Sequence, residues 1–117
     1  MKHVHFKAWT DWETPAGPSL EAFQQVVLDG MKFVETNCRQ KKEKLVVHCR
    51  AGIGRTGTTI ALINACLFLH KSSEKLSVFS IVRRLREQRI LMCQTQNQYE
   101  YIYFFLKSLD LKKLAPV

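Results

Sequence analysis

Apolar and polar residues alternate near the start of the chain, which predicts a β-strand over residues 3–9 (HVHFKAW). A polar segment with two prolines and a glycine follows and is typical of a loop. From Leu20 the apolar residues recur at helical intervals, which predicts an amphipathic helix to about Asn37. Its apolar face comprises Phe23, Val27, Met31 and Val34.

A second, buried strand is predicted over residues 44–48 (KLVVH), a short β-branched run that follows a basic turn. Strand, helix and strand in this order form a right-handed crossover, so the two strands should lie parallel with their carboxyl ends at one edge. Ligands bind at such an edge of a parallel sheet. The predicted fold class is therefore α/β, a sheet that contains parallel strands and is flanked by helices.

Three further helices are predicted downstream. One covers residues 55–70 and is apolar on nearly all sides, as expected of a central, packed helix. The next begins near Val78 and carries arginines on its polar face, which we expect to be solvated. The last follows Thr95, which together with Gln98 has the form of a capping box.

Length and charge narrow the possible functions. The 117 residues allow one domain with a modest core. The net charge of +8 suits an anionic substrate or surface, although dispersed basic side chains are more often solvated, and nucleic-acid binding is not expected. The start of the chain does not resemble a secretory signal, and its longest apolar segment is too short to span a bilayer.

The four cysteines show neither zinc-ligand spacing nor a disulfide framework. Reduced thiols in a cytoplasmic protein are therefore expected, without a bound metal.

Residues 48–57 (HCRAGIGRTG) join the second predicted strand to the central helix and contain the candidate chemistry. Glycines let successive backbone N–H groups turn inward, and the start of a helix adds its positive end to the same concavity. Cys49 lies among these donors, so its thiol should ionise readily and act as a nucleophile. Arg55 carries a planar fork that matches two phosphate oxygens. The stretch predicts covalent phosphate-ester chemistry, and a structural cysteine beside a glycine turn is the alternative.

This stretch resembles the signature loop of the cysteine-dependent protein tyrosine phosphatases, which has the pattern HCxxGxxRTG. All six fixed positions match, at His48, Cys49, Gly52, Arg55, Thr56 and Gly57. A nucleotide-binding P-loop does not fit, because no lysine lies between Lys44 and Lys71.

The resemblance implies a role for each residue of the loop. Cys49 would be the nucleophile, Thr56 would assist release from the cysteinyl phosphate, and His48 would hold the cysteine by hydrogen bonding, which is compatible with a structural histidine. The phosphate cradle would be formed by Arg50, Ala51, Gly52, Ile53, Gly54 and Arg55. No cofactor is implied.

A second loop extends the resemblance towards the start of the chain. The family's acid loop, WPDxGxP, is matched by Trp9, Asp11 and Pro15, whereas Thr10 and Glu13 replace its inner proline and its glycine. The resemblance implies that Asp11 acts first as acid and then as base, and it places Trp9 among the substrate-binding residues. An ordinary turn aspartate is the alternative for Asp11.

A third loop follows the predicted arginine-rich helix. The family's glutamine loop, QTxxQY, is matched by Gln94, Thr95, Gln98 and Tyr99. Its two glutamines would place the hydrolytic water, although Gln98 could serve only as the capping partner of Thr95. Arg50 departs from the family, in which serine is commonest at this position of tyrosine-specific members, and adds a positive charge at the rim.

The resemblance covers residues 4–109, but the family's catalytic domain is considerably longer. Its first half supplies further strands and a loop that grips the phosphotyrosine ring. Residues 1–117 are therefore predicted to be the C-terminal portion of a single catalytic domain, with an incomplete phosphotyrosine phosphatase-like fold. Such a chain should need the preceding half or self-associate, because its sheet edges stay open.

The predicted function is hydrolysis of phosphotyrosine in a protein or peptide through a cysteinyl phosphate, as a step of signal transduction. Thr10 and Glu13 leave open a phosphotyrosine-binding fragment or pseudophosphatase with weak turnover. Arg50 and the basic charge leave open a dual-specificity or phosphoinositide phosphatase.

Overall fold

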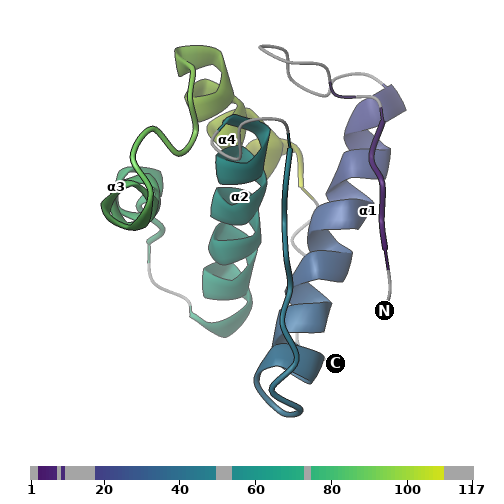
Figure 1. The fold of residues 1–117 in the computed structure, drawn as a ribbon. Coiled ribbons are helices and arrows are strands. Elements are labelled where there is room, and N and C mark those ends of the chain that lie inside the picture. Colours follow the sequence, from purple (N-terminus) through teal and green to yellow (C-terminus); the bar gives the residue numbers. More distant parts are fainter. Residues whose placement is uncertain (1–2, 8, 10–17, 50–53, 73–74, 110–117) are drawn as a thin grey trace.

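The computed structural model describes residues 3–7, 9, 18–49, 54–72 and 75–109, and this part of the chain is mainly helical (Figure 1). Its helical elements in chain order are α1 (Pro18–Phe33), the π-helical turn η1 (Val34–Cys38), α2 (Gly54–Lys71), α3 (Val78–Gln88) and α4 (Gln96–Ser108). Helix α2 contacts α1, α3 and α4, so it is the element around which the others pack.

The central position of α2 follows from its sequence, because apolar or small residues surround most of the helix. Its residues at the contacts with neighbouring helices are fully buried, namely Ala61, Leu62, Ala65 and Cys66. The predicted central helix is confirmed, with one more residue at each end than expected.

Helix α1 buries one face of its amphipathic sequence, including Phe23, Val27 and Met31. The predicted helix is confirmed, although it begins at Pro18 and its last turn is π-helical. Glu35 in this turn joins the end of α1 to the end of α2, because its carboxylate lies 3.0 Å from the Lys71 ammonium and 3.3 Å from the Arg39 guanidinium.

Helix α4 begins with the predicted capping box. The Thr95 hydroxyl accepts a hydrogen bond from the Gln98 amide at 3.1 Å, and Oε1 of Gln98 accepts one from the Thr95 amide at 3.1 Å. Helix α3 begins in a similar way, since the Ser77 hydroxyl accepts from the Ser80 amide at 3.2 Å. Both caps satisfy amides that have no partner within the helix.

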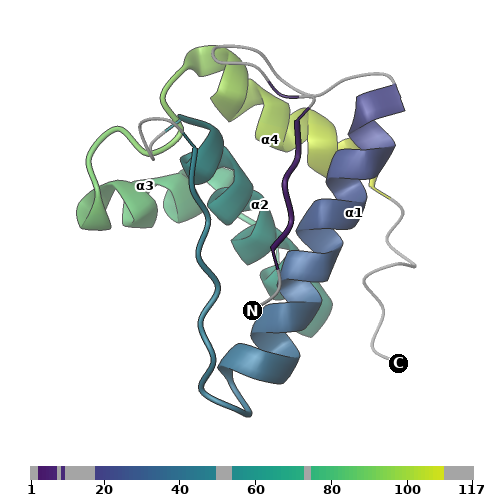
Figure 2. The ribbon, with the colours of Figure 1, turned by 45° about the vertical axis from the view of Figure 1, so that its right-hand side comes forward.

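The predicted α/β fold is wrong for the described residues, among which no β-strand pairing occurs. Residues 3–7 and 43–49 are extended and run in the same direction in both views (Figures 1 and 2). Neither segment is buried as a central strand would be: Val46 is 79% exposed and Val4 is 56% exposed.

The physical reason is that strand formation depends on a neighbour. A helix makes its hydrogen bonds within one segment, whereas a strand needs a partner about 4.8 Å away. The alternating and β-branched sequences therefore predict an extended backbone correctly, but they do not supply the pairing. The first extended segment packs on α1 instead, where the Phe6 and Phe23 rings lie 5.3 Å apart.

An aromatic cluster fixes the end of the first extended segment. The Trp9 ring meets the edge of Phe23 at 5.0 Å between ring centroids, and Phe23 meets Phe105 at 5.7 Å. Tyr101 of α4 lies 6.4 Å from Trp9. Trp9 is only 6% exposed, so this cluster holds its backbone near the start of α2.

Candidate active site

Cys49 ends the extended segment that leads towards α2, and a threonine of α2 contacts its sulfur. The Thr56 hydroxyl donates a hydrogen bond to Sγ of Cys49 at 3.0 Å. A donor at this distance stabilises negative charge on sulfur and therefore favours the thiolate. Thr56 is buried in the first turn of α2, so its position is set by the helix rather than by a free loop.

Arg55 links the same turn to the first extended segment. Its Nη1 donates to the backbone carbonyl of Trp9 at 3.0 Å, across 46 positions of sequence. This hydrogen bond brings the tryptophan of the predicted acid loop next to the arginine of the predicted phosphate cradle. Asp11 itself lies outside the described residues, as do Arg50, Ala51, Gly52 and Ile53.

The side chains of Gln94 and Gln98 both lie at Gly54, the first residue of α2. A Cβ added at Gly54 would be 3.1 Å from Oε1 of Gln94 and 3.1 Å from Nε2 of Gln98. A side chain at this position would therefore require the two amides to move by a few tenths of an ångström. The structure therefore brings the glutamines of the third loop to the end of the signature stretch.

Gln98 is also the capping partner of Thr95, which was the alternative interpretation of this residue. Its Oε1 accepts hydrogen bonds from the amides of Gln94 at 2.9 Å and Thr95 at 3.1 Å, and its side chain is 2% exposed. The oxygen is thus used by the cap while the amide nitrogen lies at Gly54, so one side chain serves the cap and lines the site.

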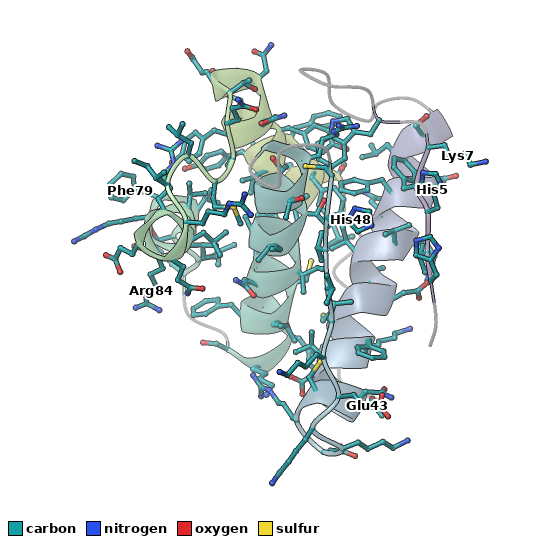
Figure 3. The ribbon with its side chains drawn as sticks, in the orientation of Figure 1. His5, Lys7, Glu43, His48, Phe79 and Arg84 are labelled. Atoms are coloured by element: carbon teal, nitrogen blue, oxygen red, sulfur yellow. The ribbon has the colours of Figure 1, made fainter. Side chains whose placement is uncertain are left out.

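His48 lies on the extended segment between α2 and α1 (Figure 3). It is exposed, so it is not a buried core histidine.

Gly57 has a different role from the one that the sequence suggested. It is the fourth residue of α2 rather than a loop residue, and it is buried. A Cβ at this position would overlap the backbone nitrogen of Cys93 and lie 2.9 Å from the carbonyl carbon of Met92. Gly57 therefore permits the segment before Gln94 to pack directly on the first turn of α2.

Arg86 is exposed, as predicted for the arginines of its helix, but its guanidinium also makes two hydrogen bonds that the sequence does not predict. Its Nε donates to the carbonyl of Met92 at 3.0 Å and its Nη2 donates to the carbonyl of Cys93 at 2.9 Å. The same-helix residue Arg84 is exposed and projects outward, as does Phe79 (Figure 3). The sequence gives no signal for this difference, because both arginines occupy the polar face of one amphipathic helix.

The buried cysteines are electrostatically unlike a nucleophile. Burial raises the pKa of the Cys66 thiol to about 12. Burial also raises the pKa of Cys93, and the Thr58 hydroxyl and the Arg86 charge oppose that effect. Both thiols are therefore protonated at neutral pH.

The described residues contain no group of three or more histidine, cysteine or acidic side chains that could hold a metal ion. Within the same ranges, no helix has the length and apolar character needed to cross a bilayer.

The geometry defines a class of site: a cysteine at the end of an extended segment, with a hydroxyl, a guanidinium and two amides around the first turn of a helix. The sequence model of the family described as protein-tyrosine phosphatase matches residues 1–107. The chain belongs to the protein-tyrosine phosphatase family.

Relatives agree with this assignment. The chain is 39% identical over 103 residues to receptor-type tyrosine-protein phosphatase epsilon of Rattus norvegicus, covering 88% of this chain and 14% of that protein. It is 36% identical over 118 residues to receptor-type tyrosine-protein phosphatase H of Homo sapiens, covering 99% of this chain and 10% of that protein.

A third relative has no receptor designation. The chain is 38% identical over 110 residues to tyrosine-protein phosphatase non-receptor type 9 of Homo sapiens, covering 88% of this chain and 18% of that protein. The chain thus spans a small part of the length of these relatives. No solved structure matches it significantly.

Proposed function

We propose that the chain hydrolyses phosphotyrosine in a protein or peptide through a cysteinyl phosphate. The observation that carries the proposal is the hydrogen bond from Thr56 to the Cys49 sulfur in a turn that also presents Arg55 and receives both glutamines. We also propose that residues 1–117 form the C-terminal portion of one catalytic domain.

In the first step the Cys49 thiolate attacks phosphorus, so that an S–P bond forms while the bond from phosphorus to the tyrosine oxygen breaks. Asp11 donates its proton to the leaving phenolate oxygen. Arg55 and the backbone N–H groups of residues 50–55 bind the phosphoryl oxygens, whose charge grows in the transition state. Trp9 and Arg50 contribute to substrate binding at the rim, and His48 orients the cysteine.

In the second step water attacks phosphorus, the S–P bond breaks, and Asp11 takes the proton from the water. Gln94 and Gln98 orient that water, in accord with the position of both amides at Gly54. The Thr56 hydroxyl stabilises the departing thiolate. The scheme uses no metal or cofactor.

The test is a phosphotyrosine peptide assay in the presence of a chelator, comparing the parent with Cys49→Ser and Cys38→Ser. Cys38 is a partly exposed free cysteine away from the proposed chemistry and serves as the matched control. We expect Cys38→Ser to retain turnover and Cys49→Ser to lose it. Acid quenching should trap a phosphoenzyme in the parent and none in Cys49→Ser. Parent-like activity of Cys49→Ser would contradict the covalent mechanism.

A second candidate is capture of phosphotyrosine with little turnover. Thr10 and Glu13 favour it, because they replace the proline and glycine of the family's acid loop. Tight phosphopeptide binding without release of phosphate would support capture, and multiple turnover would exclude it.

A third candidate is a dual-specificity or phosphoinositide phosphatase. Arg50 and the net charge of +8 favour it, because both suit acidic substrates. Phosphotyrosine, phosphothreonine and phosphoinositide substrates compared at one ionic strength separate tyrosine specificity from a dual-specificity or phosphoinositide activity.

A nucleophilic thiol must stay reduced, and no disulfide joins the cysteines of the described residues. We therefore propose that the chain acts in a reducing compartment such as the cytoplasm.

A further inference from the structure

The segment before Gln94 has an unusual backbone. Leu91 and Cys93 adopt left-handed conformations, with φ of 66° and 62°. Side chains other than glycine disfavour this region, so the surrounding structure must hold the segment in place. The conformation of residues 91–93 sets the direction in which Gln94 leaves the turn.

Arg86 holds this segment from the α3 side. Its two hydrogen bonds, at 3.0 Å and 2.9 Å, go to consecutive carbonyls, those of Met92 and Cys93. A guanidinium suits this task because its N–H groups point in fixed, nearly parallel directions. A lysine ammonium has no such planar fork.

Helix α2 holds the same segment from the other side. Because Gly57 has no side chain, the backbone of Cys93 can pack directly against it. The Thr58 hydroxyl lies 3.7 Å from the Cys93 sulfur. Beyond the segment, Gln98 accepts a hydrogen bond from the Gln94 amide at 2.9 Å. The backbone leading to Gln94 is thus fixed by Arg86, by the first turn of α2 and by the cap of α4.

We propose that Arg86 is a positioning residue for Gln94, and through it for the water that attacks the cysteinyl phosphate. This inference rests on the proposed function, because it assigns Arg86 to the second step of that reaction. The hydrogen bonds of Arg86 go to the carbonyls of Met92 and Cys93, so its effect on the reaction would pass through this segment. Its loss should therefore leave phosphorylation of Cys49 nearly unchanged and impair the transfer of phosphate to water.

The experiment measures both steps with p-nitrophenyl phosphate, in the presence and absence of glycerol as a competing phosphoryl acceptor. Arg86→Ala should release nitrophenolate in a burst and then turn over more slowly than the parent. Its ratio of glycerol phosphate to inorganic phosphate should rise roughly three- to tenfold, the range given by the loss of one hydrogen-bonded constraint. The product ratio of Arg86→Lys should lie between those of the parent and Arg86→Ala.

Arg84→Ala is the matched control, since Arg84 is an exposed arginine of the same helix. It should give parent values for both the burst and the product ratio. The partition ratio is independent of the amount of folded protein, so it separates positioning from a general loss of stability. Thermal unfolding of each variant accompanies the assay.

Gln94→Ala distinguishes failure of the inference from failure of the proposed function. If Gln94→Ala shifts the product ratio and Arg86→Ala does not, the role of Arg86 is wrong while the proposed function stands. If the parent forms no phosphoenzyme, or Gln94→Ala leaves the ratio unchanged, the proposed second step is wrong and the inference falls with it.

Discussion

Gly57→Ala tests whether the start of α2 and the segment before Gln94 are packed as tightly as the structure shows. The added methyl group would overlap the Cys93 nitrogen and lie 2.9 Å from the carbonyl carbon of Met92. Both are backbone atoms and cannot rotate away, so the segment must move. That movement would also stretch the two hydrogen bonds from Arg86.

The expected magnitude combines three effects. Overpacking costs about 1–3 kcal/mol, and two weakened hydrogen bonds cost about 0.5–1.5 kcal/mol each. Alanine gains about 1 kcal/mol over glycine inside a helix. The net loss of unfolding free energy is therefore about 3 kcal/mol, which for a chain of this size lowers the melting temperature by roughly 10 °C.

Gly30→Ala provides a matched control in α1. Its added Cβ would lie 2.8 Å from Cδ1 of Ile63, the end of a side chain that can change rotamer. The gain in helix propensity should offset most of that rearrangement, so we expect stability within about 1 kcal/mol of the parent. The assay is circular dichroism at the helix band during heating and in urea. Equal melting temperatures for Gly57→Ala and Gly30→Ala would refute the close packing of α2 on residues 92–93.

Three other changes probe separate features of the same structure. Thr95→Ala should lower the unfolding free energy by about 1 kcal/mol because it removes the cap of α4, whereas Thr95→Ser should keep most of it, as measured in urea. Leu91→Gly should raise the unfolding free energy by about 0.5–1 kcal/mol, because Leu91 is left-handed and half-exposed, whereas Ile90→Gly in the same assay should lower it. Mild peroxide should modify Cys49 before Cys66 and Cys93, which are fully buried and whose pKa values burial raises, and a thiol should restore activity. Mass spectrometry that finds either buried cysteine modified first would contradict this order.

The helices could be predicted from the sequence because their determinants are local. The apolar face of α1, the apolar circumference of α2 and the Thr95–Gln98 pair are all visible within a few residues. Each helix makes most of its backbone hydrogen bonds within itself. Its place in the sequence can therefore be predicted without knowing which part of the chain packs against it.

The predicted sheet has no counterpart among the described residues, because strand pairing is not set by the local sequence. Residues 44–48 contain the β-branched pair Val46 and Val47, yet Val46 is 79% exposed and the described residues pair no strands. Strand formation requires a neighbour of the right length, direction and register, and none of these is encoded in the strand itself. The predicted self-association of such an open edge stays a prediction.

The contacts of Arg86 and Gly57 show the same limit at the level of single residues. Arg86 looks like Arg84 in sequence, but only Arg86 faces the carbonyls of the turn after α3. Gly57 looks like a loop glycine, but the surface that it opens belongs to Cys93, which lies far along the chain. A one-dimensional pattern records which side chains are present, and it does not record which backbone atoms approach them.

The first turn of α2 explains why these residues are adjacent in the sequence. Successive helical residues point about 100° apart, so four neighbours face four directions. Gly54 faces the two glutamines, Arg55 the Trp9 carbonyl, Thr56 the Cys49 sulfur and Gly57 the backbone at Cys93. One helical turn is thus the junction of three separate segments, which contain Trp9, Cys49 and residues 92–98. A shift of that turn caused by any one of these segments must alter its contacts with the other two.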